Sequence, residues 1–503
     1  MNQSRRKFLG QAALWLTGAS LADTLLPLDA QAALKYKVGP WRGDDFAMGH
    51  KMRNGEVPDF PQKVEAQLDF VIVGGGLSAL TAAHKLKNHN YLLLEQYPQL
   101  GGQARGENHN GLWYSLAAAY FVDLEGAVGR LCDEFGLKPV SIGPEKNSYL
   151  WQNKWFNGIK GPESNVLYKN FKALESDIKP IMDRCAATGL DIPVADSELL
   201  RLDGIKYSEM LTGYDAQFKE IMTACISSSA CGSVDTVSAL AGANLVADFF
   251  NTSYVFPGGN PALARALEQE IRETGAERLK TGAFVWHVEI GDNSAEVVYS
   301  DASGMHRVKC RHVIITTPPL VSGRILANVK NSAKANLFWF RYGSYLVANV
   351  MLKERLFKGP YDNFTTAPYP FADITVAETP YVKNGTYKAE MGQILTVYQP
   401  FAPGTAGRSL LLEGDRTKLA ANILEPLNKL VPMAGKIDQV VLSRWGHAIA
   451  VPYPQYYNRI NQVLANTGDS YSLAHSSLYG MQCLEAAVQA GTKAAQRALR
   501  GKS

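Results

Sequence analysis

The sequence has little net charge and no long basic run. Its 503 residues carry 51 lysines and arginines against 47 aspartates and glutamates, which gives a formal charge of +4. Proteins that bind nucleic acid usually concentrate Lys and Arg along one face or in one run. The absence of such a run excludes a nucleic-acid partner.

Cysteine is scarce and is not arranged as a set of ligands. The 6 cysteines form no CxxC or CxxCH motif and show no zinc-type spacing, so the sequence predicts neither a metal site nor covalently attached haem. Cys225 and Cys231 are the closest pair, and an exported chain could oxidise them. Buried thiols are the preferred interpretation, because a chain of this length does not need disulfides to fold.

No uninterrupted apolar run reaches the roughly 20 residues that span a bilayer. The N-terminus contains Arg5-Arg6-Lys7, a broken apolar stretch and then Ala30-Gln31-Ala32, a small-x-small cleavage pattern. We interpret residues 1–32 as a twin-arginine signal peptide. This predicts recognition by the twin-arginine export machinery, a periplasmic location and no stable membrane span. The route usually carries folded cargo with an inserted cofactor, which suggests a prosthetic group.

The overall composition is that of a globular protein. Hydrophobic residues make up 46% and charged residues 19% of the chain, which argues against disorder and against a coiled coil. The length favours two closely joined domains.

The strongest motif follows an apolar run of buried-strand type at residues 68–73. The next six residues, Gly74-Gly75-Gly76-Leu77-Ser78-Ala79, fit G-x-G-x-x-G/A, and a second strand-like run ends at Glu95, about 20 residues further on. Gly74 permits the tight turn, Gly76 lets the backbone approach a pyrophosphate, and Ala79 keeps the following helix close to the strand. The helix N-terminus offers unpaired N–H groups to phosphate, and Glu95 can accept a ribose hydroxyl. The motif predicts a dinucleotide site.

A second glycine pair distinguishes between dinucleotides. Gly101-Gly102 follows Glu95-Gln96 and precedes Gln103 and Arg105. Two phosphate-facing loops favour the larger flavin dinucleotide, and an acid at position 95 disfavours the 2′-phosphate of NADP. With the run 113–118, this arrangement resembles the flavin-containing amine oxidase family, whose members are FAD-dependent and carry two dinucleotide loops.

Later segments resemble the same family in the same order. Residues 256–261 are similar to its central Gly-Gly segment, residues 313–319 to its returning strand, and residues 471–476 and 482–487 to its closing FAD segment. The resemblance implies FAD as cofactor, with the backbone of Val285 against the adenine. A helix from Cys483 to Leu499 would point its N-terminus at the flavin and stabilise the reduced ring. The expected cofactor-binding residues are Gly74, Gly76, Ser78, Ala79, Glu95, Gln96, Gly101, Gly102, Gln103, Arg105, Val285, Ser476, Cys483, Leu484, Glu485 and Ala486.

The resemblance implies an α/β fold in which a discontinuous Rossmann-like FAD-binding domain carries an inserted α+β substrate domain. We expect the FAD-binding domain at residues 64–138, 256–319 and 468–499, and the substrate domain at 140–250 and 333–445. Within the latter, the patterns of residues 167–183 and 214–225 predict helices. Those of residues 345–352 and 409–412 predict strands.

The candidate catalytic residues are His447, Trp445 and Tyr479. Neutral His447 could orient substrate or take a proton, while Trp445 and Tyr479 could wall an aromatic slot. For each of them, a side chain satisfied within the core is the alternative.

We expect an exported FAD-dependent oxidoreductase that oxidises an amine or amino acid, a small-molecule substrate, by hydride transfer to flavin N5. Two alternatives stay open: an FAD-dependent desaturase or dehydrogenase acting on a C–C or C–O bond, and a non-catalytic flavin-binding partner protein. The family often has a lysine near N5 on the strand after a Tyr-Gly pair, but Tyr342-Gly343 is followed by none before Lys353. Oxygen, a quinone and a cytochrome therefore all stay open as electron acceptors.

Overall fold

The computed structural model describes residues 35–122, 124–143, 145–185 and 190–500. The expected signal peptide at residues 1–32 lies outside them. Of the helices in these ranges, none has both the length and the apolar character that crossing a bilayer requires.

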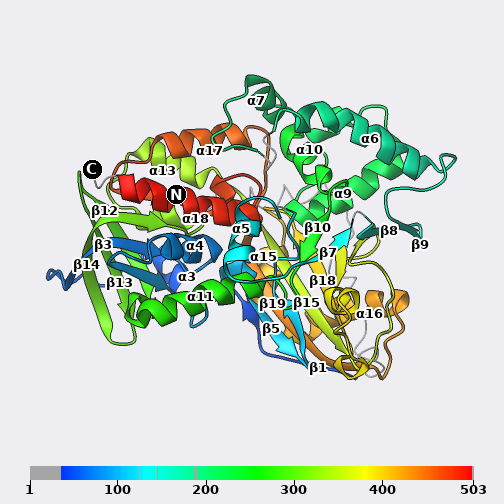
Figure 1. Cartoon of the computed structure of the whole chain (residues 1–503), viewed down its shortest axis with the longest axis horizontal. Helices are drawn as coiled ribbons and strands as arrows, with labels where there is room; N and C mark the ends of the chain where they lie inside the picture. The colour runs from blue at the N-terminus through cyan, green and yellow to red at the C-terminus, as the bar shows by residue number, and fades with distance from the viewer. Residues whose placement is uncertain (1–34, 123, 144, 186–189, 501–503) are drawn as a thin grey trace, which may run out of the picture.

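One sheet of seven strands is assembled from three separate stretches of the chain (Figure 1). Its strands are β3 (Ala66–Val73), β4 (Tyr91–Glu95), β11 (Leu279–Thr281), β12 (Phe284–Ile290), β13 (Ala295–Asp301), β14 (Gly304–Ile315) and β20 (Tyr471–Leu473). The order is β11-β4-β3-β14-β13-β12, with β20 paired to β14. The pairs β11–β4, β4–β3, β3–β14 and β14–β20 are parallel, and β12 to β14 form an antiparallel meander. The apolar run of β3 is buried because it lies in the middle of this parallel region.

Three helices pack against strands of this sheet: α4 (Leu77–Lys85), α11 (Pro261–Gly275) and α18 (Leu484–Arg500). Helix α4 also contacts the other two, and α5 (Ala127–Glu134) packs on α18. Although α4 and α18 are about 400 positions apart in the chain, they lie side by side (Figure 1), and Ser78 Oγ donates to the Ala487 carbonyl at 2.9 Å. Gly491 allows this approach, because a Cβ there would lie 2.2 Å from the Ser78 carbonyl oxygen. Helix α18 thereby packs beside the helix that follows the Gly74–Gly76 turn.

A second sheet of nine strands forms the other half of the molecule. Its strands are β1 (Lys37–Val38), β2 (Arg42–Gly43), β8 (Asn147–Trp151), β9 (Lys154–Asn157), β15 (Tyr342–Leu352), β16 (Asp362–Thr365), β17 (Asp373–Val376), β18 (Gln393–Phe401) and β19 (Ile437–Ala450). The order is β1-β19-β15-β18-β17-β16-β8-β9, and β2 also pairs with β19. The segment before β3 thus adds two short strands to this sheet, parallel to β19.

A group of helices gathers at one end of this second half (Figure 1). Its members are α6 (Val166–Met182), α7 (Ser197–Asp203), α8 (Tyr207–Met210), α9 (Ala216–Ala230) and α10 (Ala239–Ala247). The remaining α-helices of the described chain are α3 (Ala47–Arg53), α12 (Pro319–Ile325), α13 (Asn331–Phe338), α14 (Thr379–Lys383), α15 (Gly407–Glu413), α16 (Arg416–Leu430) and α17 (Tyr456–Ala465). Two small strands, β7 (Val140–Gly143) and β10 (Ser253–Val255), pair with each other, as do β5 (Gly106–His109) and β6 (Leu112–Ser115).

The α/β class expected from the sequence is confirmed, and helices α6 and α9 and strand β15 form where their patterns predicted them. The strand expected at residues 409–412 is wrong, because these residues belong to α15. Gly407 and Leu411 are its buried positions, one helical turn apart, so the apolar run packs through one helix face. All six cysteines are free thiols, so Cys225 and Cys231 are not joined.

Candidate active site

One large cavity lies between the two sheets. Its volume is about 2060 Å³, and its wall includes residues of both halves and of the segment before β3. Sites for single drug-sized ligands usually measure about 300–1,000 Å³, so this cavity has room for a dinucleotide and a further ligand. Apart from Ala79, which packs inside α4 with no exposed surface, all of the sequence-predicted site residues line it: Gly74, Gly76, Ser78, Glu95, Gln96, Gly101, Gly102, Gln103, Arg105, Val285, Trp445, His447, Ser476, Tyr479, Cys483, Leu484, Glu485 and Ala486.

Two glycine loops meet at the start of α4. The Gly101 N–H donates to the Gly75 carbonyl at 2.8 Å, and a Cβ on Gly102 would lie 3.0 Å from Gly76 Cα. Helix α4 begins after Gly76 without a side-chain cap. Its first N–H groups are therefore free to bind phosphate, and the positive end of the helix dipole adds to that attraction.

Glu95 ends β4 at the edge of these loops. Burial raises the pKa of its carboxyl group, and the N–H of Tyr97, which donates to Oε1 at 2.8 Å, opposes that shift. Glu95 lines the cavity, so a ribose hydroxyl could donate to it.

Arg105 follows the second glycine pair. Its Nε donates to the Gly102 carbonyl at 2.9 Å and its Nη2 to the Gly43 carbonyl at 3.0 Å. The guanidinium carbon also lies 4.9 Å from the Tyr97 ring centroid and 5.3 Å from that of Trp445. Arg105 therefore fixes the loop and places a positive charge on the cavity wall beside it.

The N-terminus of α18 closes the cavity from the other side. Cys483 Sγ accepts the Ala486 N–H at 3.4 Å, and Glu485 Oε1 accepts the Val122 N–H at 2.6 Å. Just upstream, His475 Nδ1 accepts the Ser477 N–H at 3.2 Å, which leaves the proton on Nε2. Burial lowers the pKa of His475 to about 3, so this ring is neutral and Nε2 can donate to a ligand.

The donor set fits FAD. Glycine positions that reject a Cβ, free helix N–H groups, an acid for the ribose and a second helix N-terminus occur along one continuous wall. Gly74, Gly76, Gly102 and Glu95 would hold the dinucleotide part, and the segments at His475 and Cys483 would face the flavin. The role of each residue stays a prediction.

The three catalytic candidates all line the cavity. Trp445 is buried and donates its Nε1–H to the Leu116 carbonyl at 2.9 Å. Burial, followed by the nearby Arg408 and His50, lowers the pKa of His447 to about 4, so its imidazole is neutral near pH 7. Burial also raises the pKa of Tyr479 to about 12, which keeps its hydroxyl protonated. These residues can shape and hydrogen-bond a ligand, and their catalytic role remains a prediction.

Sequence reasoning missed an acidic part of the same cavity. Asp248, Asp362 and Asp373 line it, and Asp362 and Asp373 are the first residues of β16 and β17. For Asp373, an acid directly before the β-branched run Ile374-Thr375-Val376 was the available signal, whereas Asp362 begins the mostly polar strand Asp-Asn-Phe-Thr and gave none. The two strands pair only through the tertiary fold, so the meeting of the two acids could not be read from spacing.

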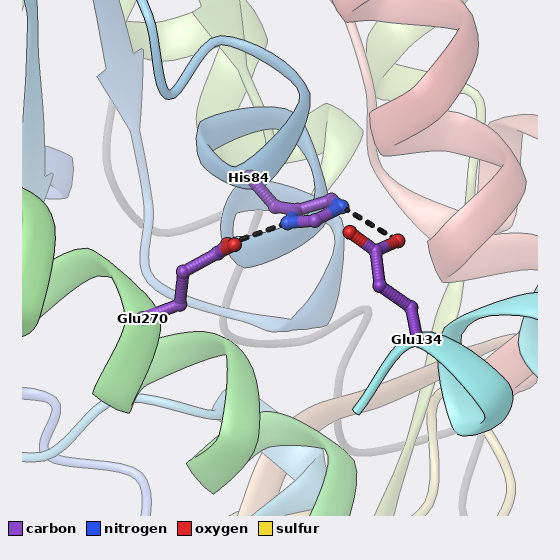
Figure 2. Close-up of side chains that lie close together, drawn as sticks. All are labelled: His84, Glu134 and Glu270. Carbon is purple, nitrogen blue, oxygen red and sulfur yellow. Dashed lines mark hydrogen bonds and ion pairs between the residues drawn. The ribbon is translucent and has the colours of Figure 1, made fainter. Parts of the chain in front are cut away.

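A separate cluster lies outside the cavity. Figure 2 shows His84 of α4 between Glu134 of α5 and Glu270 of α11. Its Nδ1 lies 2.5 Å from Glu270 Oε2 and its Nε2 lies 3.3 Å from Glu134 Oε2. Lys87 Nζ lies 2.9 Å from Glu270 Oε1. Because both ring nitrogens already face carboxylates and a lysine shares them, we interpret the cluster as an ion-pair network that joins three helices.

Comparison with known proteins adds family and fold. The family described as flavin containing amine oxidoreductase matches residues 77–499. Protoporphyrinogen oxidase 2 of Arabidopsis thaliana is 32% identical over 106 residues, which cover 20% of this chain and 21% of that protein. A protein of Dictyostelium discoideum named as a flavin-containing monoamine oxidase A is 24% identical over 273 residues, covering 51% and 59%. The matches therefore span less than two thirds of these relatives.

Solved structures share the fold. Cyclohexylamine oxidase from Brevibacterium oxydans superposes with a TM-score of 0.66 at 15% identity, over 86% of this chain and 99% of that chain. Putrescine oxidase bound to putrescine gives a TM-score of 0.68 at 17% identity, with coverage of 86% and 99%.

Proposed function

Because the chain belongs to the family of flavin containing amine oxidoreductases, we propose that it oxidises an amine or an amino acid in an FAD-dependent reaction. When bound, FAD accepts a hydride equivalent from the carbon next to the substrate nitrogen. The observation that carries the proposal is the single cavity in which the dinucleotide loops, the N-terminus of α18 and aromatic side chains meet. Neither a desaturase nor a non-catalytic flavin protein is favoured by the family match.

This chain's own residues supply position and environment. Buried rings of Trp445, Tyr345 and Tyr479 line the cavity and exclude water, which favours the neutral amine that can release a hydride. Neutral His447 offers a hydrogen bond without a positive charge that would repel an ammonium.

A panel of amines and amino acids tests the proposal. Purified yellow protein is mixed anaerobically with each compound, and flavin absorbance is followed. We expect bleaching by at least one amine, with the corresponding carbonyl product and ammonia or a shorter amine after turnover. If no amine or amino acid bleaches the flavin, the proposed function is wrong.

For the electron acceptor, we propose a quinone or a cytochrome. The support is that β15, the strand on which family members often carry a lysine near flavin N5, contributes no lysine to the cavity. Among the described residues, the lysines on the cavity wall are Lys179 and Lys493. Reoxidation of the substrate-reduced protein should be faster with a soluble quinone or cytochrome than with oxygen at equal concentration. Faster reoxidation by oxygen would contradict this proposal.

We also propose export through the twin-arginine route to the periplasm. The support is the Arg5-Arg6 pair followed by the small-x-small pattern at Ala30-Gln31-Ala32. Replacing Arg5 and Arg6 together with lysine should retain the protein in the cytoplasm of a bacterial host, as measured by fractionation. Equal periplasmic amounts of both forms would argue against this route.

A further inference from the structure

Three carboxyl groups line the part of the cavity that is bounded by the nine-stranded sheet. Asp248 caps the C-terminus of α10, while Asp362 and Asp373 begin β16 and β17. In the antiparallel pairing of β16 with β17, Asp362 lies opposite Thr375 and Asp373 lies opposite Phe364. Asp362 and Asp373 are thus diagonal neighbours on one face of the sheet.

The acids of this pair are buried and only partly satisfied. Their exposed fractions are 2% for Asp362 and 6% for Asp373. Ser228 Oγ donates to Asp373 Oδ2 at 2.6 Å. Oδ1 of each carboxyl group is buried and has no donor from any other described residue. The two groups can satisfy each other only if one of them keeps a proton, because two carboxylates both accept.

The nearby Lys146 side chain has hydrogen-bond partners other than the two carboxyl groups. Lys146 Nζ donates to the Asp248 backbone carbonyl at 2.7 Å and to Ser253 Oγ. It lies 4.8 Å from the centroid of the Tyr120 ring and is not part of the cavity wall. Lys146 is therefore the positive charge that acts on Asp248 and Asp362, and it does not reach the cavity wall beside the three acids.

Burial sets the protonation of these acids. It raises the pKa of Asp373 to about 6 and that of Asp248 to about 7. Burial and the neighbouring Asp373 together raise the pKa of Asp362 well above its usual range. Near pH 7 the pair therefore holds one shared proton and one negative charge.

We propose that Asp362 and Asp373 form the binding site for a second cationic group of the substrate, an ammonium or guanidinium separate from the amine that is oxidised. This inference rests on the proposed function of the same cavity. An incoming cation supplies a donor of the kind that neither Oδ1 receives from another described residue, and it balances the negative charge of the pair. Tyr120, Tyr345, Phe364 and Tyr398 also line this cavity, and their ring faces attract a cation.

The pair also disfavours substrates whose far end is uncharged or negatively charged. A substrate with an uncharged alkyl end would leave the negative charge of the buried pair without a counter-charge, and a substrate with a carboxylate there would meet like charge. The site therefore selects diamines or amines with a distant basic group over simple alkylamines.

The test compares α,ω-diaminoalkanes of increasing length with n-alkylamines of the same length. For each pair, the ratio of kcat/KM for flavin reduction by the diamine to that by the monoamine is measured on the FAD-loaded protein. We expect one length to give a ratio of at least tenfold, and Asp373→Asn to reduce that ratio at least tenfold. The amide still accepts the Ser228 hydroxyl, so the variant retains its anchor.

Glu378→Gln is the matched control. Glu378 is as buried as the pair, follows β17 closely and does not line the cavity. Its substitution removes a buried carboxyl group but should leave the diamine ratio as it is. A ratio near one in the unmodified protein, or an equal loss in both variants, would overturn the inference. If no amine reduces the flavin at all, the proposed function fails instead.

A second measurement needs no variant. The pair gains its negative charge as the pH rises past about 6, and Asp248 gains its own past about 7. The diamine ratio should therefore rise across that range. Dividing by the kcat/KM of the monoamine removes pH effects that act on both substrates alike. The other titratable groups near the pair are Lys146, Asp248, Cys225, Tyr120, Tyr345, Tyr361 and Tyr398, and burial raises the pKa of the thiol and of the phenols, which keeps them neutral. A ratio independent of pH would contradict a role for the pair.

Discussion

At the scale of single residues, Gly74 shows how the first loop excludes a side chain. Its φ of +106° suits glycine, and a Cβ there would lie 2.3 Å from Thr316 Oγ1, which donates to the Val73 carbonyl. Gly74→Ala should therefore strain the loop by about 1–3 kcal/mol and weaken FAD binding. The measurement is the flavin-to-protein absorbance ratio and the Kd of added FAD.

Gly435→Ala is the matched comparison for this prediction. Gly435 also has a positive φ, of +73°, but no atom lies within 4 Å of the added Cβ. It lies between α16 and β19 and does not line the cavity, so it imposes similar backbone strain away from the loops. If both variants keep the same FAD affinity, the contact with Thr316 does not shape the site.

His447 makes a prediction about pH. Its pKa of about 4 means that the ring is neutral throughout the neutral range, so it can hydrogen-bond a substrate but has no ionisation there. We expect His447→Asn to slow anaerobic flavin reduction by a similar factor from about pH 6 to about pH 9. An ionisation near the ordinary histidine pKa that disappears in the variant would show that His447 titrates during the reaction.

At the scale of secondary structure, the contact between α4 and α18 holds α18 beside the helix that follows the Gly74–Gly76 turn. Gly491→Ala should raise helix propensity by about 0.5–1 kcal/mol, yet its Cβ would lie 2.2 Å from the backbone oxygen of Ser78. We expect the close approach to dominate, so that thermal stability and FAD retention both fall.

A glycine-to-alanine substitution in a helix with free space around it separates the gain in helix propensity from the effect of the close approach. Gly49 lies in α3 with nothing within 4 Å of an added Cβ, so Gly49→Ala should be neutral or stabilising. If Gly491→Ala is also stabilising in a thermal melt, the two helices do not pack as described.

The ion-pair network of Figure 2 ties α4 to α5 and α11. Burial alone would raise the pKa of Glu270, but hydrogen bonds from His84 and Lys87 outweigh it and hold that pKa below its usual value. A carboxyl group with a lowered folded-state pKa stabilises the protein above its unfolded pKa and loses that effect as the pH falls through the folded value. Glu270→Gln should therefore cost about 1 kcal/mol near pH 7, the size of a partly exposed ion pair, and less near pH 3, where the carboxyl group is losing its charge.

Melting temperatures at both pH values check this prediction. Glu273→Gln, on the exposed face of α11, is the control and should change little at either pH. A cost for Glu270→Gln that is the same at both pH values would mean that the carboxyl charge is not what joins the helices.

At the scale of the whole molecule, the parts predicted well are those with local causes. Strand β3, its glycine turn and α4 follow one another in sequence, so the meeting of Gly74, Gly76 and Glu95 on one cavity wall could be predicted from spacing alone. The closing segment at Cys483 was placed by its resemblance to a family, and the structure brings it to the same cavity.

The features that could not be predicted from the sequence depend on pairing between distant segments. Asp362 and Asp373 meet because β16 and β17 pair, and Lys37–Gly43 joins a sheet whose neighbour β19 lies 400 residues later. Residues 409–412 were misassigned because a four-residue apolar run fits a strand or one turn of a helix, and only burial of Gly407 and Leu411 on one face distinguishes them.

The central claim is that this molecule oxidises an amine beside FAD held between its two sheets. Anaerobic stopped-flow reduction of the bound flavin by an amine, compared with the same amine deuterated at the carbon next to nitrogen, tests it most directly. The account predicts that the flavin bleaches and that deuteration slows the bleaching, because that C–H bond breaks in the step that reduces the flavin. Flavin that stays oxidised, or bleaching at the same rate with both amines, would contradict it.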